Sequence, residues 1–326
     1  MRPPAFWQNP PRAAGAMARM LQPLGLIYAA VTANRVARQG YRAAVPVVCI
    51  GNLNVGGTGK TPATIALLAR VEGAHVVSRG YGGALDGPVR VDPMRHTAAE
   101  VGDEPLLLSA FAPTWVAKDR AAGVRAAEAA GAKLVLMDDG FQNPSVQKDF
   151  SLIVVDAERG FGNGLCLPAG PLREPVAAGL SRAQALLSIG GEAAQAQFVR
   201  DWGATIHIPH LRGQLKPLRM GMDWRGQRVL AFAGIGHPEK FFATLRTEGA
   251  EIVKAVALDD HQPLSDALLR RLETEAATLG AQMVTTEKDQ VRLPVSFRSK
   301  VLTLVVRLEV EDWSCLDKAM AGLKQS

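Results

Sequence analysis

The stretch 45–69 constrains the fold of this chain more than any other part of the sequence. A short apolar run, Val47 to Ile50, predicts a buried strand, and a glycine-rich turn followed by an apolar helical pattern comes directly after it. A loop in this setting binds phosphate, because its backbone N–H groups and the N-terminus of the next helix point toward the anion. We therefore predict a nucleotide-binding loop made of Asn54, Val55, Gly56, Gly57, Thr58, Gly59, Lys60 and Thr61.

This loop departs from the phosphate-binding pattern G-x-x-x-x-G-K-[ST] at its first position, where the chain has Asn54. Asparagine adopts a left-handed backbone more readily than most other residues, and the neighbouring glycines add freedom. An ordinary glycine-rich turn is the alternative interpretation. The flanking strand and helix favour the nucleotide site, in which Lys60 supplies a positive charge to the outer phosphates and Thr61 a hydroxyl ligand for Mg²⁺.

A second motif supports the same kind of site. The apolar run 134–137 predicts a buried strand that ends in Asp138 and Asp139, with Gly140 relieving the turn. P-loop proteins hold Mg²⁺ with an aspartate at the end of such a strand, opposite the hydroxyl of the loop. Because two adjacent carboxylates at the end of a buried strand are hard to explain as surface residues, we assign both to a metal site together with Thr61.

Strands and helices alternate through the first two thirds of the chain. Further apolar runs occur at 75–78, 114–118, 152–156 and 185–189, and a long loop, 160–175, of a length that is more often functional than idle, lies between the last two. This alternation is typical of a parallel sheet covered on both faces, and ligands of such sheets bind beyond the carboxyl ends of the strands. The predicted fold class is α/β, with a P-loop NTPase-like α/β/α domain around a parallel sheet and a smaller second α/β domain.

Changes in composition divide the chain into four predicted segments. They are a basic amphipathic N-terminal segment (1–44), the P-loop domain (45–208), an extended linker with prolines and basic residues (209–227) and the second α/β domain (228–326). The second domain has its own glycine turn at 234–236 after a predicted strand. That turn lacks a lysine comparable to Lys60, so a second nucleotide site has weak support.

The composition excludes several classes of protein. With 326 residues, of which 48% are hydrophobic, the chain is long enough to form two packed domains. Its cysteines, Cys49, Cys166 and Cys315, lie far apart, which argues against a zinc site or a disulfide framework and is typical of a reducing compartment. Aromatic residues make up only 6%, and no nucleic-acid-binding module is evident, so the net charge of +6 does not indicate a nucleic-acid partner.

The N-terminal segment is strongly basic, because no acidic residue precedes Glu72. Apolar residues recur at helical spacing from Met17 to Val31, but Pro23 interrupts this stretch. It is short for a signal peptide and too short to span a bilayer. Two interpretations remain open, namely a helix that packs on its own domain and a helix that lies in a membrane interface with its arginines toward lipid phosphates.

Three further places carry candidate site residues. Arg79 follows the strand 75–78 in a glycine-rich turn, and it is either a phosphate clamp or a solvated surface residue. Asp103 and Glu104 open a helix, where acidic residues cap the N-terminus without any catalytic role. His261 follows two acids near the end of a predicted strand, where it is a candidate for an oriented base or a proton carrier.

Seven motifs, in this order along the chain, resemble those of the tetraacyldisaccharide 4'-kinase family. They are G-N-L-N-V-G-G-T-G-K-T-P, S-R-G-Y-G-G, G-D-E-P, D-D-G-F-Q, P-A-G-P-L-R-E-P, D-D-H-Q and T-T-E-K-D, from Gly51 to Asp289. The resemblance implies transfer of the γ-phosphate of ATP to the 4'-hydroxyl of a tetraacylated glucosamine disaccharide 1-phosphate, giving lipid IVA in lipid A biosynthesis. It also implies ATP and Mg²⁺ as cofactors, and a peripheral location at the cytoplasmic face of the inner membrane of a Gram-negative bacterium.

The same resemblance implies roles for individual residues. Asp103 is the expected catalytic base, with His261 from the second domain as its partner, and Asp138 and Asp139 match the acidic pair near Mg²⁺. Weaker candidates for binding substrate or phosphate are Arg79, Arg120, Gln142 and Arg173. Gln262 stands where many members carry a second histidine, so no role is carried over to that position.

In this family context, the basic N-terminal segment is expected to contact acyl chains and the anionic surface of the inner membrane, and no nucleic acid or obligate protein partner is implied. Two other classes compete: a switch that couples nucleotide hydrolysis to a protein partner, and a lipid-binding scaffold with a vestigial loop. Intact Lys60, Thr61 and Asp138 argue against the scaffold. Because Lys60 and His261 belong to different predicted domains, we expect the second domain to close over the site and exclude water.

Overall fold

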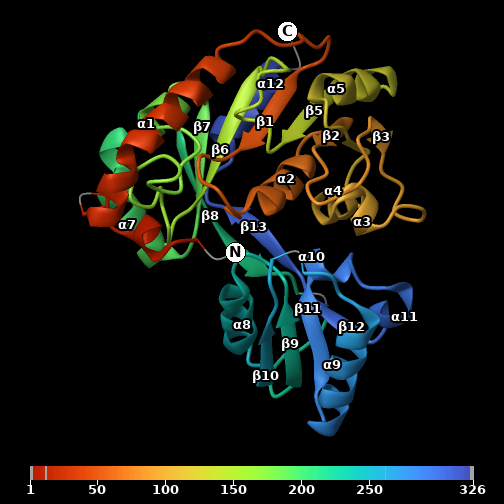
Figure 1. The fold of residues 1–326 in the computed structure, drawn as a ribbon. Coiled ribbons are helices and arrows are strands. Elements are labelled where there is room, and N and C mark those ends of the chain that lie inside the picture. Colours follow the sequence, from red (N-terminus) through yellow and green to blue (C-terminus); the bar gives the residue numbers. More distant parts are fainter. Residues whose placement is uncertain (1–2, 12, 220, 261, 324–326) are drawn as a thin grey trace.

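The computed structural model describes residues 3–11, 13–219, 221–260 and 262–323 of the chain. Within these ranges the chain forms two α/β units of unequal size, each around its own sheet (Figure 1). The described strands of the larger sheet follow the order β13-β8-β7-β6-β1-β5-β2-β4-β3, and those of the smaller sheet the order β10-β9-β11-β12. The predicted fold class, a P-loop NTPase-like domain with a smaller second α/β domain, is confirmed.

The centre of the larger sheet is parallel and buried. β1 (Val47–Gly51) lies between β5 (Leu134–Asp138) and β6 (Phe150–Asp156), and every residue of these strands is buried. The parallel arrangement continues with β2 (Ala74–Ser78), β4 (Thr114–Val116) and β7 (Ala185–Ile189). A strand buried on both faces carries a nearly continuous apolar run, which is why such runs in the sequence located these strands correctly.

Two short edge strands make the larger sheet mixed rather than purely parallel. β3 (Val89–Arg90) is antiparallel to β4, and β13 (Val306–Val310) is antiparallel to β8 (His210–Pro217). Both lie at the ends of the sheet, away from the strands that precede the predicted nucleotide site. The prediction of a parallel sheet is therefore right at the centre of the sheet and wrong at its edges.

Helices cover both faces of the larger sheet. α2 (Lys60–Leu68) and α12 (Ser314–Leu323) share one apolar cluster with alternate residues of β1, such as Val48. α5 (Arg120–Ala129) and α7 (Glu192–Trp202) share a second cluster on the opposite face. The shorter helices of this unit are η1 (Ala5–Gln8), α3 (Ala98–Val101), α4 (Asp103–Leu108), α6 (Val176–Leu180) and η2 (Gly203–Thr205).

The second unit is inserted into the first. After β8, which pairs in parallel with β7, the chain leaves the larger sheet, builds the smaller sheet and returns as β13. The smaller sheet is parallel throughout and consists of β9 (Arg228–Ala233), β10 (Glu251–Ala257), β11 (Gln282–Thr286) and β12 (Val301–Leu304). Its helices are α8 (Pro238–Thr247), α9 (Asp266–Thr278), α10 (Glu287–Gln290) and α11 (Val295–Arg298).

Two predicted domain boundaries differ from this topology. The sequence predicts a linker over 209–227, but residues 210–217 form strand β8 of the larger sheet. It also assigns 228–326 to the second domain, but β13 and α12 return to the first unit, where Leu308 and Met320 are buried in the same apolar cluster as residues of α2 and β1. β8 has several exposed polar residues, so its composition resembles that of a linker, and only its pairing with distant strands places it in the sheet.

α1 (Ala16–Val36) is one helix despite its internal proline, and it runs along the flank of the larger unit (Figure 1). It contacts the protein through small residues: Ala18, Gly25 and Thr32 are buried, and a Cβ at position 25 would lie 2.9 Å from the carbonyl oxygen of Cys166. Tyr28 is partly buried against the core, but six other large apolar side chains are exposed, namely Met17, Met20, Leu24, Leu26, Ile27 and Val31. None of the helices in the described ranges has the length and hydropathy needed to cross a membrane.

Candidate active site

The segment 54–61, called the P-loop below, leads from β1 into the first turn of α2 and leaves open space beside Gly56 and Gly57. Gly56 and Gly59 have left-handed φ angles of 104° and 92°, which residues with side chains rarely adopt. Gly57 has no such angle, and a Cβ at position 57 would have no atom of the described residues within 4 Å. The fold itself therefore does not require a glycine there, and the missing side chain leaves room for a ligand against the backbone.

Asn54 stands at the first glycine position of the motif, but it does not adopt the left-handed backbone that the sequence suggests for it. In the described part of the chain, Asp139 is the only non-glycine residue with a left-handed φ, so Asn54 has no such backbone. Asn54 is instead buried, and its Nδ2 donates to the carbonyl oxygen of Gly160 at 3.1 Å, which ties the P-loop to the long loop after β6. Asn52 supports the P-loop from inside, with Nδ2 donating to Thr58 Oγ1 at 3.1 Å.

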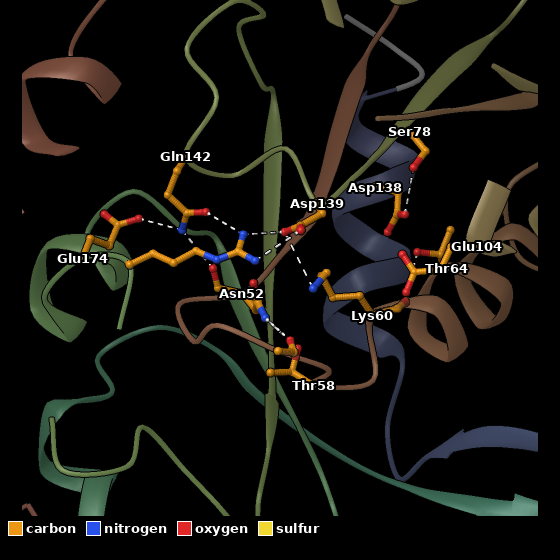
Figure 2. Close-up of polar contacts among 12 residues, drawn as sticks. Asn52, Thr58, Lys60, Thr64, Ser78, Glu104, Asp138, Asp139, Gln142 and Glu174 are labelled. Atoms are coloured by element: carbon orange, nitrogen blue, oxygen red, sulfur yellow. Dashed lines mark hydrogen bonds and ion pairs between the residues drawn. The ribbon is translucent and has the colours of Figure 1, made fainter. Parts of the chain in front are cut away.

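Lys60 points toward the acidic residues at the end of β5 (Figure 2). Its Nζ lies 3.7 Å from Asp139 Oδ1, and Arg173 donates to the two oxygens of the same carboxylate at 2.9 and 3.4 Å. Burial alone would raise the pKa of Asp139, but the charges of Lys60 and Arg173 outweigh burial and lower that pKa. The site therefore gathers two positive charges next to the P-loop around one ionised carboxylate.

Asp139 also stands on a strained turn. Its φ of 51° costs on the order of 1 kcal/mol for a residue with a side chain, and such strain persists only where the surroundings hold it. Its N–H donates to the carbonyl oxygen of Ile50 at 3.0 Å, in the strand that leads into the P-loop. The turn after β5 and the P-loop are therefore fixed relative to each other by backbone contacts.

Asp138 is buried and retains capacity to bind a cation. Ser78 Oγ donates to its Oδ2 at 3.3 Å, whereas Oδ1 is buried and accepts no hydrogen bond from any described residue. Burial, together with the nearby carboxylate of Glu104, raises the pKa of Asp138 to about 7, and Lys60 opposes this rise. A hard divalent cation, which prefers oxygen ligands, would offset the cost of burying this carboxylate.

The surroundings of Asp138 therefore fit Mg²⁺. Thr61 lies half-buried in the first turn of α2 and offers a hydroxyl oxygen of the kind that such a cation binds. Asp139 is already engaged by Lys60 and Arg173, which favours a supporting position beside the cation. Within the described ranges, no group of three or more His, Cys, Asp or Glu side chains forms a metal site.

Gln142 and Arg173, both predicted to bind substrate or phosphate, have different surroundings. Gln142 is buried, and its Nε2 donates to the carbonyl oxygen of Asn52 and to Glu174 Oε1, both at 2.9 Å. Its Oε1 accepts from Arg173 at 3.4 Å, and Arg182 donates to the other oxygen of Glu174 at 2.6 Å. These contacts favour a role for Gln142 in positioning Arg173, whose side chain is 24% exposed beside the P-loop.

Arg120 and Arg79, the two other predicted arginines, lie at different depths. Arg120 is 3% exposed, and its Nη1 donates to the carbonyl oxygen of Ala117 at 2.8 Å. Burial lowers the pKa of Arg120, although the charges of Asp138 and Asp139 oppose that shift. Arg79 is exposed directly after β2. Arg120 therefore acts as a buried countercharge to the acidic pair, whereas Arg79 is accessible to a ligand.

Asp103, the predicted base, opens α4 beside the turn that follows β2. It is 3% exposed, and its Oδ1 accepts a hydrogen bond from the N–H of Glu104 at 2.9 Å. Lys288 of α10 reaches this place from the second unit, with Nζ 3.8 Å from Asp103 Oδ2 and 3.3 Å from Glu104 Oε1. The predicted partner of Asp103, His261, lies outside the described residues.

Lys288 is a candidate site residue that the sequence analysis missed, although it belongs to the T-T-E-K-D motif. A second lysine makes a contact of the same kind on the other side of β1, at the end of β6. There Lys240 of α8 lies 2.8 Å from Asp156 Oδ2 and 2.9 Å from Glu158 Oε2. One lysine of the second unit thus contacts carboxylates of the first unit on each side of the P-loop.

The chain and its fold match one known family. A family model described as tetraacyldisaccharide-1-P 4'-kinase matches residues 17–323. Relatives named tetraacyldisaccharide 4'-kinase are 62% identical in Dinoroseobacter shibae, covering 99% of this chain and 98% of the relative, and 57% identical in Jannaschia sp., covering 98% of each. The crystal structure of LpxK from Aquifex aeolicus in complex with ATP has the same fold, with a TM-score of 0.78 over 94% of this chain and 99% of that one, at 23% identity. The chain therefore belongs to the tetraacyldisaccharide 4'-kinase family.

Proposed function

We propose that this protein transfers the γ-phosphate of ATP to the 4'-hydroxyl of a tetraacyldisaccharide 1-phosphate. The observation that carries the proposal is the placement of Lys60, Asp138 and Asp103 along one edge of the larger sheet. These residues are a phosphate-binding charge, a buried carboxylate with an unused oxygen, and a candidate base. Family membership supports the acceptor, and the ATP complex of the Aquifex aeolicus relative supports the donor.

The P-loop and Lys60 bind the outer phosphates of ATP in this proposal. The backbone N–H groups of the loop and the N-terminus of α2 favour an anion at the open face beside Gly57. Lys60 and Arg173 both contact Asp139, so a phosphate that arrives there meets two cations that are already oriented. Charge arranged before the reaction stabilises the transition state more than charge that must reorganise.

Asp138 and Thr61 hold Mg²⁺, with Asp139 in support. When bound, Mg²⁺ neutralises charge on the β- and γ-phosphates. Asp138 suits this role because burial opposes its ionisation and its Oδ1 accepts no hydrogen bond from a described residue. Arg120 keeps a positive charge behind the acidic pair.

Asp103 acts as the base for the acceptor. The oxygen of the 4'-hydroxyl forms a bond to the γ-phosphorus, and the bond from that phosphorus to the bridging oxygen breaks, its electron pair leaving on ADP. The hydroxyl proton passes to a carboxylate oxygen of Asp103. Because phosphoryl transfer proceeds through a loose transition state, we expect the proton to move late and the carboxylate chiefly to orient the hydroxyl. His261 assists Asp103, as the family resemblance implies.

The exposed apolar side of α1 supports peripheral attachment to the cytoplasmic face of the inner membrane. The helix packs on the protein through small residues and leaves Met20, Leu24 and Ile27 exposed, at a spacing that places them on one side. Arg19 and Arg35 are exposed on the same helix and suit contact with lipid phosphates. This arrangement fits an acceptor whose acyl chains remain in the membrane.

A transfer assay with labelled ATP and tetraacyldisaccharide 1-phosphate tests the proposed reaction. We expect the label to enter the lipid in proportion to the ADP formed. Release of ADP without labelled lipid would contradict the proposal and would favour a switch that couples hydrolysis to a protein partner.

Charged substitutions on α1 test the membrane contact. Met20 and Ile27 are 68% and 61% exposed, so Met20→Asp with Ile27→Asp should leave thermal unfolding unchanged. We expect binding to anionic vesicles to weaken by about tenfold or more, because the lost apolar burial is worth at least one such factor. Val295→Asp is the matched control, since Val295 is 78% exposed on the second unit. Undiminished vesicle binding by the α1 variant would contradict the contact.

A further inference from the structure

Lys288 brings a positive charge from the second unit to a group of carboxylates at the start of α4. Its side chain is 22% exposed, and its Nζ lies 3.3 Å from Glu104 Oε1 and 3.8 Å from Asp103 Oδ2. Asp260, which lies after β10 in the second unit, also acts on this ammonium group. Carboxylates from both units therefore face one lysine.

The charge state of Lys288 follows from this setting. Burial alone would lower the pKa of Lys288, but the carboxylates of Glu104, Asp103 and Asp260 outweigh burial and raise that pKa. The ammonium group is therefore charged over the whole range in which an enzyme of this kind works. It neutralises its neighbours and does not exchange a proton with the substrate.

Glu104 interacts with both Lys288 and Asp138, the proposed ligand of Mg²⁺. Its carboxylate contacts Lys288. Glu104 also lies on the same side of the site as Asp138 (Figure 2), and its charge raises the pKa of Asp138. Without the ammonium group, the negative charges of Asp103 and Glu104 would stand side by side at the start of one short helix. Removal of a positive charge from beside two adjacent carboxylates favours protonation of one of them.

We propose that Lys288 is a positioning residue for phosphate transfer, which keeps Asp103 ionised and oriented toward the acceptor. This inference rests on the proposed role of Asp103 as the base. A base must be ionised to accept the hydroxyl proton, and an opposite charge within about 4 to 6 Å favours the ionised carboxylate. Lys288 belongs to the inserted unit, so it lies beside Asp103 only where that unit contacts α4. Activation of the acceptor hydroxyl therefore depends on the contact between the two units.

A purely structural role for Lys288 is the alternative, and the chain contains a matched control for it. Lys240 also belongs to the second unit and also pairs with two carboxylates of the first unit, Asp156 and Glu158. Asp156 ends β6 and Glu158 lies just beyond it, whereas Asp103 lies beside the turn after β2, and strands β1 and β5 stand between β6 and β2. Loss of Lys240 removes a connection between the units without removing charge from the proposed base.

The substitution Lys288→Met removes the charge and keeps the apolar stem. We expect kcat on the lipid acceptor to fall by about tenfold to hundredfold at neutral pH, with KM for ATP changed by less than about threefold. Asp103 without its cation binds a proton more readily, so the acid limb of the kcat profile should move to higher pH by about one unit. Lys288→Arg keeps the charge and should return the limb toward its wild-type position.

Lys240→Met should leave the acid limb in place. A fall of kcat in Lys288→Met without movement of the limb, or an equal movement in Lys240→Met, would overturn the inference. Thermal unfolding shows whether each variant is folded. If Lys288→Met is not folded, Lys288→Gln, which keeps a hydrogen-bond donor without the charge, decides the question by the same measurement.

Asp103→Asn separates this inference from the proposed base. Wild-type kcat in Asp103→Asn would show that Asp103 is not the base, and both statements would fail. An inactive Asp103→Asn together with an unmoved limb in Lys288→Met or Lys288→Gln would overturn the role of Lys288 alone.

Discussion

Each unit has a glycine turn directly after a buried strand, and only the first of these turns is open to a ligand. In the P-loop, a Cβ at position 57 would meet no described atom within 4 Å. In the turn after β9, the N–H of Gly234 donates to both carboxylate oxygens of Asp289, each at 3.2 Å. A Cβ at position 234 would lie 2.7 Å from Nη2 of Arg292. The second unit thus supplies its own carboxylate where the first leaves room for a phosphate.

A strand followed by a glycine turn is therefore not enough to identify a nucleotide site. What distinguishes the two turns is whether a carboxylate of the protein already accepts hydrogen bonds from a backbone N–H of the turn, as Asp289 does from Gly234. Lys60 and Arg173 stand beside the P-loop, whereas a buried carboxylate fills the second turn. That carboxylate belongs to Asp289, the neighbour of Lys288, so the filled turn fixes the short helix that carries Lys288 toward Asp103.

The largest expected effect is on the filled turn. Asp289→Ala should lower the free energy of unfolding by about 3 to 5 kcal/mol, because it leaves the buried guanidinium of Arg292 without its carboxylate. Urea unfolding measures this loss. Asp289→Ala combined with Arg292→Met should be less destabilised than the single variant, since no unpaired charge remains. A loss below about 1 kcal/mol would show that the turn does not depend on the carboxylate.

The next effect concerns the open turn. Lys60→Ala should lower kcat/KM for transfer by about 10²- to 10³-fold, because it removes a charge aimed at the outer phosphates. The free energy of unfolding should change by less than about 1 kcal/mol. Lys254→Ala is the control, since Lys254 pairs with Glu275 on the surface of the second unit, and it should transfer phosphate like the wild type. Phosphate transfer at the wild-type rate by Lys60→Ala would contradict the assignment of residues 54–61 as the nucleotide-binding loop.

The smallest effects come from adding one methyl group to each turn. Gly57→Ala should leave stability within about 0.5 kcal/mol and weaken ATP binding by about tenfold, because the methyl group occupies space kept for the ligand. Gly234→Ala should lower stability by about 1 to 3 kcal/mol through its contact with Arg292 and leave ATP affinity unchanged. Chemical unfolding and calorimetric titration with ATP measure both. A loss of stability in Gly57→Ala together with a loss of ATP affinity in Gly234→Ala would contradict the comparison.

Much of the site could be predicted from the sequence, because the P-loop and the acidic pair each follow an apolar run that marks a buried strand. The strands β1, β5 and β6 are buried on both faces, so each appears as an apolar run, and the residues that follow each run lie at the carboxyl edge of the sheet. The P-loop, Asp138 and Asp139 were placed by this reasoning alone. Asp103 needed the family resemblance, because an acid that opens a helix has an adequate structural explanation without catalysis.

The sequence by itself determined which short segments are strands, which turn can bind phosphate and which carboxylates end beside it, since these properties depend on residues a few positions apart. Only the tertiary structure decided that β8 and β13 close the larger sheet around an inserted unit. It also decided that Lys288 meets Glu104 across 184 positions of sequence and that a carboxylate fills the turn at Gly234. Contacts of this kind depend on the path of the whole chain, and a lysine that joins two units has the same local pattern as a lysine in solvent.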